Sequence, residues 1–386
     1  MRLVNLENDQ VRGKDCSMIP QILNRKYEIG TKIFSFTDDS RNEVLGEGTG
    51  KRKITVRLFY PVTMSSIEGA KKAPYVSENK WECLRKMYHM PKSAGVVNEV
   101  DIYENVPMIE EKFPLVLYNH GYSGYIEANT FLCMEIVSRG YIVASIGHSY
   151  EGLCTEYDDG SFVPFDKKIN KMMYQKGAFR AILAQLKLLK KKGSIEEIYK
   201  DFLMFEKEHT PYIVGRLKEW SADTLCALKI VKERFADNID LTNGVAATGH
   251  SMGGALAYYL CQTSNEISCG LNIDGGLFGD YREMTLTKPF FQISCKENWN
   301  VESAVLLHRK ALVYCAIFDN MKHIGFTDAK FFIPVKMIVG KMDAMKMHNY
   351  LTKCHIFFLD KYLKGLDVKK IESDDNEIKI DISETE

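Results

Sequence analysis

Two continuous apolar runs separated by a helical stretch constrain the fold of this chain most strongly. The first run, in FPLVLYNHG at residues 113–121, has the pattern of a strand buried on both faces. A helical pattern, ANTFLCMEIVSRG, follows it and ends at Gly140, and YIVASIGHS at residues 141–149 is a second buried strand. A strand, a helix and a strand this close together predict a βαβ unit, which requires a parallel sheet.

The same alternation resumes in the second half of the chain. GVAATGHS is predicted as a strand and MGGALAYYLCQT as a helix, and further strands are predicted at residues 269–274, 288–295 and 311–318 before a closing amphipathic helix. Another strand is predicted at residues 53–62. These elements predict one α/β domain over residues 27–365, with a mostly parallel central sheet flanked by helices.

Three segments depart from this alternation. Residues 1–30 are polar and predicted to be irregular. Amphipathic helical patterns fill residues 151–220, and we expect them to form a helical lid, or cap, inserted in the domain. Residues 366–386 are acidic and poor in aromatic residues, which predicts a weakly ordered tail.

Charge and cysteine usage exclude several classes of protein. The 386 residues include 51 Lys and Arg and 51 Asp and Glu, so the net charge of zero argues against a strongly cationic nucleic-acid binder. The N-terminus lacks the apolar segment of a secretory signal, and no apolar run approaches the roughly 18 residues of a membrane span. Because the ten cysteines are scattered without a C-x-x-C pair, we expect buried free thiols and a cytoplasmic protein.

The pentapeptide Gly249-His250-Ser251-Met252-Gly253 matches the G-x-S-x-G pattern of a nucleophile elbow. It follows a predicted strand and opens a predicted helix, which is the context that this elbow requires. The sharp turn holds the serine at strained dihedral angles, and only residues without a Cβ fit beside it. We therefore predict Ser251 as a nucleophile, the alternative being a glycine-rich turn with a passive serine.

A serine hydroxyl needs a base, and four histidines follow Ser251 in the chain. His308 lies in an amphipathic helical run, and His348 and His355 lie in the closing helix. His323 is predicted in a loop after a strand, from which a side chain can reach over the sheet. We predict His323 as the base.

The base needs an orienting carboxylate, for which the sequence offers three candidates. Asp274 ends the strand at residues 269–274, and a carboxylate there lies on the same rim of the sheet as the nucleophile. Glu297 ends the next strand, and Asp280 lies in a polar loop. We favour Asp274 and keep Glu297 as the alternative.

An oxyanion hole needs two backbone N–H donors. Met252 follows the nucleophile and supplies one, and the turn after the strand at residues 113–121 supplies the other, with Tyr122 as the predicted donor. His120 is interpreted as a structural histidine that holds this turn. With no His and Cys cluster at metal spacing, we predict neither a metal nor a cofactor.

These motifs together resemble the α/β-hydrolase superfamily. The chain is most similar to the platelet-activating-factor acetylhydrolase family of the plasma and type II intracellular kind and its bacterial relatives, through YEIGTKIFSFTDDSR, FPLVLYNHGYSG, SRGYIVASIGHSYEG, VAATGHSMGGALA, CGLNIDGGLFGDY and KHIGFTD. The resemblance implies the α/β-hydrolase fold, with Asp274 as the acid, His323 as the base, and Tyr122 and Met252 as the oxyanion donors. It also implies metal-independent hydrolysis of an ester with a short or polar acyl group.

Other functions remain open at this stage. A general carboxylesterase, lipase, polyester hydrolase or peptidase would use the same triad, whereas a non-catalytic scaffold would not retain all its members. The expected partner is a small ester or a phospholipid, not a nucleic acid. Lys190-Lys191-Lys192, beside an apolar helix face, allow weak contact of the lid with a membrane surface, but the sequence alone favours a solvated helix end with cations near its C-terminus. Gly46–Lys51 has the wrong spacing for a phosphate-binding loop.

Overall fold

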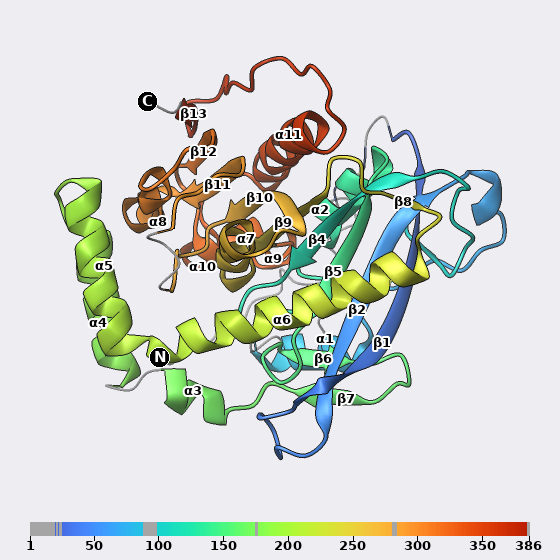
Figure 1. Cartoon of the computed structure of the whole chain (residues 1–386), viewed down its shortest axis with the longest axis horizontal. Helices are drawn as coiled ribbons and strands as arrows, with labels where there is room; N and C mark the ends of the chain where they lie inside the picture. The colour runs from blue at the N-terminus through green and yellow to red at the C-terminus, as the bar shows by residue number, and fades with distance from the viewer. Residues whose placement is uncertain are drawn as a thin grey trace, which may run out of the picture.

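A computed structural model describes residue 20, residue 22 and residues 25–87, 99–173, 177–279 and 284–383. Its main sheet is built from β1 (Glu28–Asn42), β2 (Lys51–Val62), β3 (Tyr103–Glu104), β4 (Phe113–Asn119), β5 (Ile142–Gly147), β8 (Ile239–Asp240), β9 (Val245–His250), β10 (Ile267–Ile273), β11 (Phe290–Cys295), β12 (Val313–Phe318) and β13 (Ile378–Ser383). The strands follow the order β13-β12-β11-β10-β9-β4-β5-β2-β1-β3, with β8 paired to β4 (Figure 1).

The centre of the sheet is parallel, as predicted. Neighbouring strands from β5 through β4, β9, β10 and β11 to β12 all run in the same direction. Among the described strands of this sheet, antiparallel pairs occur only toward its two edges. There β2 pairs with β5 and with β1, and β13 pairs with β12. The carboxyl ends of the central strands therefore share one rim of the sheet.

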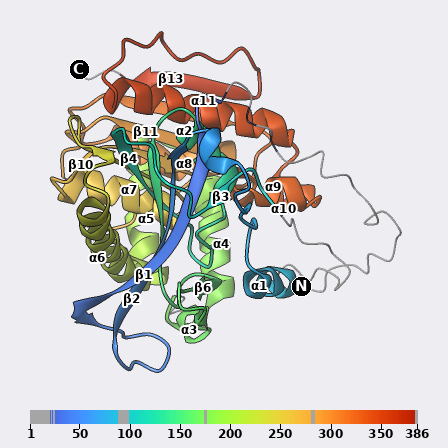
Figure 2. The same cartoon turned by 90° about the vertical axis from the view of Figure 1, so that its right-hand side faces the viewer.

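Helices cover both faces of this sheet. The helices and 3₁₀ turns are η2 (Ser65–Ile67), α1 (Glu78–Met87), α2 (Thr130–Ser138), α3 (Lys168–Met173), α4 (Ala178–Leu189), α5 (Ile195–His209), α6 (Pro211–Arg234), α7 (Met252–Thr263), α8 (Lys296–Glu302), η4 (Ser303–Leu306), η5 (His323–Phe326), α9 (Ala329–Phe332), α10 (Lys336–Val339) and α11 (Ala344–Tyr362). One apolar core includes side chains of α2 and α11, and a second includes side chains of α6 and α7. Figures 1 and 2 show α11 and α6 on opposite sides of the sheet.

Strand β4 shows why a continuous apolar run predicted a central strand. Val116 and Tyr118 contribute to the core with α2 and α11, whereas Leu115 and Leu117 contribute to the core with α6 and α7. Because successive side chains of a strand point to opposite faces, a strand between two helical layers must be apolar at every position.

Two long strands at or near the edges of the sheet, β1 and β13, were not predicted. Residues 28–42 form β1, the first strand, although residues up to 30 were expected to be irregular and the first strand was expected at residues 53–62. Its outer half, which includes TDDSRN, is largely exposed, and its register shifts between Asp38 and Asn42. A half-exposed strand carries few apolar residues, so its sequence resembles that of a loop.

The prediction of a weakly ordered tail over residues 366–386 is corrected for the residues that form β13. These residues alternate as IKIDIS and pair along the whole length of β12. Ile378 is buried, and Ile380 and Ile382 pack against the core. The acidic composition of the tail concealed this period of two, which is the pattern of a strand with one buried face.

The insertion predicted at residues 151–220 comprises several elements. It begins with a hairpin of β6 (Cys154–Glu156) and β7 (Phe162–Pro164) and continues through α3, α4 and α5. Its predicted end falls inside α6, which runs through residue 220 without a break and buries Trp220 and Leu228 in the core. Helix α6 is thus part of the layer that covers the sheet, while α4 and α5 stand at the outer edge of the molecule (Figure 1).

Two further observations bear on the expectations from composition. Within the described parts of the chain, no helix combines the length and the apolar character needed to cross a bilayer. The nine described cysteines are free, and seven of them are buried. Cys16 lies outside the described residues.

Candidate active site

Ser251 lies in the sharp turn between β9 and α7, with a φ of 58° and a ψ of −119°. The glycines on either side of it are required by close packing against the end of β4. A Cβ atom at Gly249 would lie 2.4 Å from the carbonyl oxygen of Asn119, and one at Gly253 would lie 2.0 Å from the same atom. The turn therefore has the geometry that the G-x-S-x-G pattern predicted.

The structure brings the three predicted triad residues together in one chain of hydrogen bonds. Ser251 Oγ lies 2.8 Å from His323 Nε2, and His323 Nδ1 lies 2.7 Å from Asp274 Oδ2. With its Nδ1–H donated to the carboxylate, the neutral imidazole leaves Nε2 free to accept the serine proton. The side chains come from three segments at one rim: the turn after β9, the end of β10 and η5 after β12.

Asp274 is held by more contacts than the sequence predicted. Its Oδ1 accepts the Cys295 N–H at 2.6 Å, and its Oδ2 also accepts a hydrogen bond from Asn298 Nδ2 at 2.8 Å. Burial by itself would raise the pKa of Asp274, but the hydrogen bond and charge of His323 and the Cys295 N–H outweigh it and lower the pKa. The carboxylate is thus ionised and fixed. Asn298 lies on α8, and no local sequence pattern identifies it.

The alternative acid and the other histidines lie elsewhere. Glu297 forms an ion pair with Lys322 at the surface, and Asp280 is outside the described residues. His348 Nε2 lies 3.4 Å from Glu135, and His355 Nδ1–H donates to Leu351 O. His308 lies between η4 and β12, where its backbone carbonyl accepts the Leu286 N–H at 2.7 Å.

His250 is a site residue that the sequence analysis did not single out. Its Nε2–H donates to the backbone carbonyl of His323 at 2.9 Å, and the two rings pack with centroids 4.6 Å apart. Burial, followed by the charge of His323, lowers the pKa of His250 to about 3, so this ring is neutral. His250, which precedes Ser251, thus holds the backbone of His323, the predicted base, in position.

The turn after β4 lies directly against the nucleophile. A Cβ atom at Gly121 would lie 3.1 Å from Ser251 Cβ. The Gly121 carbonyl accepts hydrogen bonds from His120 Nδ1–H at 2.7 Å and from the Gly124 N–H at 2.8 Å. Because the C=O and N–H of a trans peptide point in opposite directions, these two bonds also fix the direction of the Tyr122 N–H.

The two predicted oxyanion donors are Met252, which follows Ser251 in the chain, and Tyr122, which follows the closely approaching Gly121. Met252 is the first residue of α7, where an N–H has no partner within its own helix. Burial, with a smaller effect from His148, lowers the pKa of His120 to about 3. His120 is therefore a neutral ring that donates from Nδ1, in agreement with its interpretation as a structural histidine.

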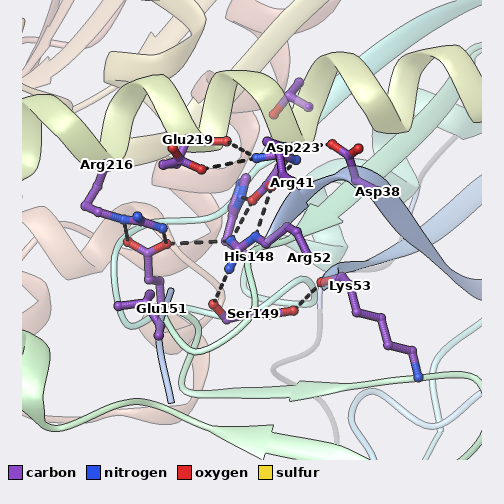
Figure 3. A network of polar contacts seen from close by, with 12 residues as sticks. Asp38, Arg41, Arg52, Lys53, His148, Ser149, Glu151, Arg216, Glu219 and Asp223 are labelled. Atoms are coloured by element: carbon purple, nitrogen blue, oxygen red, sulfur yellow. Dashed lines mark hydrogen bonds and ion pairs between the residues drawn. The ribbon is translucent and has the colours of Figure 1, made fainter. Parts of the chain in front are cut away.

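A buried ion-pair network, here called the α6 network, adjoins this turn, because the His148 N–H lies 3.4 Å from His120 Nε2. Figure 3 shows the side chains of the network. The network joins Arg52 of β2, His148 and Glu151 after β5, and Arg216 and Asp223 of α6. Arg52 Nη2 donates to Asp223 Oδ2 at 2.7 Å, and Arg216 donates to both oxygens of Glu151 at 2.9 and 2.7 Å. These ion pairs connect α6 with β2 and with the segment after β5, next to the site.

The α6 network reaches the turn after β4 through His148. Its Nδ1 lies 2.9 Å from Asp223 Oδ2, its Nε2 lies 3.1 Å from Asn119 Oδ1, and its ring stacks on Trp220 at 3.7 Å between centroids. Burial by itself would raise the pKa of Asp223, but Arg52 and His148 lower it strongly. Asp223 is therefore a buried carboxylate that depends on its cationic partner.

Helix α8 connects Asp274 with the insertion. Asn298 donates to Asp274, and two residues later Asn300 Nδ2 donates to the carbonyls of Leu188 and Lys191 at the end of α4, at 3.1 and 2.9 Å. Within the described residues, no group of three His, Cys, Asp or Glu side chains is placed to hold a metal ion. The side chains that meet at this rim are a hydroxyl, an imidazole and a carboxylate, which is the set that a serine nucleophile, its base and an orienting acid require.

Comparison with known proteins supports the resemblance seen in the sequence. The family model described as "Platelet-activating factor acetylhydrolase, isoform II" matches residues 18–381. Platelet-activating factor acetylhydrolase of Cavia porcellus is 22% identical over 268 residues, which are 67% of this chain and 59% of that protein. The Bos taurus protein of the same name is 21% identical over 269 residues, or 66% of this chain and 58% of its own. The matched segment thus spans less than two thirds of these relatives.

A solved structure extends the comparison to the fold. The ferulic acid esterase of Streptomyces cinnamoneus superposes with a TM-score of 0.66, and the match covers 92% of this chain and 96% of that one. Its sequence is 20% identical, so this likeness concerns the fold alone. It agrees with the predicted α/β-hydrolase architecture, in which a mostly parallel sheet is flanked by helices.

Proposed function

The chain belongs to the platelet-activating factor acetylhydrolase isoform II family, and on this premise we propose that it hydrolyses carboxylic esters with Ser251 as the nucleophile. His323 is the general base and Asp274 the acid that orients it. The observation that carries this proposal is the continuous hydrogen-bonded chain from Ser251 Oγ through both ring nitrogens of His323 to Asp274. This arrangement gives a serine hydroxyl the base that it needs near neutral pH.

The proposed reaction has two halves. Ser251 Oγ attacks the ester carbonyl carbon while its proton passes to His323 Nε2, and the carbonyl oxygen becomes an oxyanion. The bond to the alcohol then breaks, and His323 returns the proton to the leaving oxygen. A water molecule attacks the acyl-serine with His323 again as base, which releases the carboxylic acid and restores Ser251.

The N–H groups of Tyr122 and Met252 are proposed to bind the oxyanion. The turn that carries Tyr122 is held by His120 and Gly124 through one carbonyl, so the donor is oriented before substrate binds. Donors that are already in place cost no reorganisation during the reaction, and each contributes about 3–4 kcal/mol to transition-state stabilisation.

We further propose short-acyl or phospholipid-like esters as substrates, as for an esterase acting on a 1-alkyl-2-acetylglycerophosphocholine. The names of the two relatives support this class. The insertion would border the acyl site as a lid, because Phe278, four residues after Asp274, packs on Phe202 of α5 with ring centroids 5.5 Å apart. The Gly279 N–H also donates to the Glu206 carboxylate of α5.

A substrate panel on the wild type and Ser251→Ala tests the proposal. It contains p-nitrophenyl esters of graded acyl length, a phospholipid with a short sn-2 acyl group, methyl ferulate and a matched amide. We expect cleavage of the acetyl ester and the phospholipid, and a loss of kcat of about 10⁶-fold in the variant. Cleavage of p-nitrophenyl acetate without phospholipid turnover would leave a general carboxylesterase. A panel in which no ester is cleaved would contradict ester hydrolysis itself.

A further inference from the structure

Helix α4 has apolar side chains on two opposite faces. Ala181 and Leu188 are buried toward the rest of the protein. On the other side, four large apolar side chains are 74%, 50%, 45% and 47% exposed: Phe179, Ile182, Leu183 and Leu186, here called the α4 stripe. Their spacing of three, four and seven residues places them along a single face of the helix, because successive residues turn by about 100°.

An amphipathic helix normally turns its large apolar residues toward the protein. In α4 the buried face includes the small residue Ala181, while the α4 stripe faces outward. Single exposed apolar residues are ordinary on a protein surface, but four that adjoin one another indicate a surface that meets an apolar partner. The packing of α4 on the rest of the protein thus does not explain why its outer face carries four large apolar residues.

The charges around the α4 stripe indicate the chemistry of that partner. Residues 178–189 contain no Asp or Glu. Arg180 and Lys187 lie seven residues apart along one edge of the stripe, and Lys190 and Lys192 follow at the end of the helix; all four are exposed. Apolar residues in the middle with cations at the border are typical of a helix that lies in the interface of an anionic lipid bilayer.

The position of α4 leaves this face accessible. Figure 1 shows α4 beside α5 at the outer edge of the molecule, away from α11. Its end is held through Asn300 of α8 and through the ion pair of Lys191 with Asp201 of α5. These contacts involve backbone carbonyls and Lys191, so none of them occupies the α4 stripe.

We propose that the α4 stripe and its bordering cations dock the protein on anionic phospholipid surfaces, with α4 lying in the plane of the interface. Phe179, Ile182, Leu183 and Leu186 enter the boundary between headgroups and acyl chains, while Arg180, Lys187, Lys190 and Lys192 contact lipid phosphates. This docking does not depend on the proposed function, since it requires neither Ser251 nor any step of ester hydrolysis.

The competing occupant is a second copy of the chain. A symmetric dimer through this face would bring each stripe against its counterpart, together with the cations at its border. Like charges would then face each other with no Asp or Glu on α4 to compensate them. An anionic lipid surface offers both an apolar layer and the opposite charge, and for this reason we favour it.

Sedimentation with vesicles tests the proposal on the full chain that carries Ser251→Ala, so that no lipid is hydrolysed. The vesicles contain phosphatidylcholine alone or phosphatidylcholine with phosphatidylglycerol. Binding is expected to require phosphatidylglycerol. Serine at all four stripe positions should weaken it on the order of 100-fold. Glutamine at Arg180, Lys187, Lys190 and Lys192 should weaken it about fivefold for each cation removed.

The matched control replaces exposed apolar residues outside the insertion, Val44→Ser and Met337→Ser, and should bind vesicles as the parent does. Thermal unfolding of every variant shows whether it is folded. Equal binding by the parent and the stripe variant would overturn the proposal. It would also be overturned by a parent that does not bind vesicles but forms a dimer that the stripe substitutions dissociate. Neither result bears on ester hydrolysis, which is measured separately with soluble substrates.

Discussion

Around Ser251 the backbones of β4, β9 and α7 approach so closely that a Cβ atom at Gly253 would lie 2.0 Å from a carbonyl oxygen, whereas α4 exposes three quarters of Phe179 to solvent. The rim that carries Ser251, Asp274 and His323 is held by several independent hydrogen bonds to each side chain or its backbone. The α4–α5 hairpin is attached through Asn300 of α8 and Phe278, and the outer face of α4 stays exposed. A reaction needs fixed geometry, while a docking surface needs accessible side chains, and the two regions differ accordingly.

After substitution of Ser251 itself, the largest expected effect concerns Asp274, the proposed acid of the rim. Asp274→Asn removes the acceptor for His323 Nδ1–H and favours the wrong tautomer, so kcat should fall about 10⁴-fold. Glu297→Gln is the matched control, because Glu297 pairs with Lys322 at the surface, and its kcat should change little. Steady-state kinetics with p-nitrophenyl acetate measures both. A larger loss in Glu297→Gln would show that the acid has been misassigned.

The next effect concerns the α6 network, which fastens α6 beside the rim. Asp223→Asn removes the carboxylate that pairs with Arg52 and Arg41 and leaves the buried Arg52 with Glu43 as its hydrogen-bonded acidic partner. We expect a loss of about 3–5 kcal/mol in the free energy of unfolding. The control is Asp159→Asn, since Asp159 pairs with Lys53 at the surface and should contribute at most about 1 kcal/mol. Denaturant unfolding of both variants separates a buried pair from an exposed one.

The same carboxylate predicts how stability depends on pH. The pKa of Asp223 is lower in the folded protein than in the unfolded chain, where it is about 3.9. Its stabilising contribution is therefore complete above that value and is lost as the pH falls toward the folded-state pKa. Asp223→Asn should flatten the decline of unfolding free energy in acid. An unchanged acid slope would show that this carboxylate does not carry the effect.

Glycine substitutions compare the close backbone packing at the elbow with an open position on a helix. Gly253→Ala forces a Cβ atom into Asn119 and His120, and should destabilise the protein by about 1–3 kcal/mol or prevent folding. Gly215→Ala places a Cβ in α6 where no atom lies within 4 Å, and should stabilise by about 0.5–1 kcal/mol. Thermal unfolding measures both, and equal shifts would contradict the close packing at the elbow.

The smallest effect is expected from the α4 stripe on soluble substrate. Serine at its four positions alters no contact of the rim, so kcat and KM for p-nitrophenyl acetate should stay within about twofold of the wild type. Vesicle binding by the same variant should fall. A matching loss of activity on the soluble ester would mean that the hairpin supports the rim more directly than its contacts indicate.

The accuracy of prediction from sequence followed the degree of burial. Strand β4 was predicted because burial on both faces requires an unbroken apolar run. The elbow was predicted because its sharp turn leaves no room for a Cβ atom at Gly249 or Gly253. Strands β1 and β13 were missed, since a half-exposed strand carries charged residues that resemble a loop or an acidic tail. Whether such a segment forms a strand is decided by its pairing with the edge of the sheet, as β13 pairs with β12 and β1 with β2.

The site shows the same division. Ser251, Asp274 and His323 could be proposed because each ends or follows a recognisable strand. Asn298, His250 and the α6 network could not, because partners such as Asp223 and Arg52 are 171 residues apart and no local pattern pairs them. Their contacts arise only once the helices pack, so the support of a site is less visible in a sequence than its reacting groups.

Labelling with a fluorophosphonate, followed by mass mapping, tests the central claim most directly. We expect a single modified residue, Ser251, in the wild type, and no modification of the Ser251→Ala variant, whose folding is verified by thermal unfolding. Modification at another residue, or an unlabelled wild type that still cleaves p-nitrophenyl acetate, would contradict Ser251 as the nucleophile.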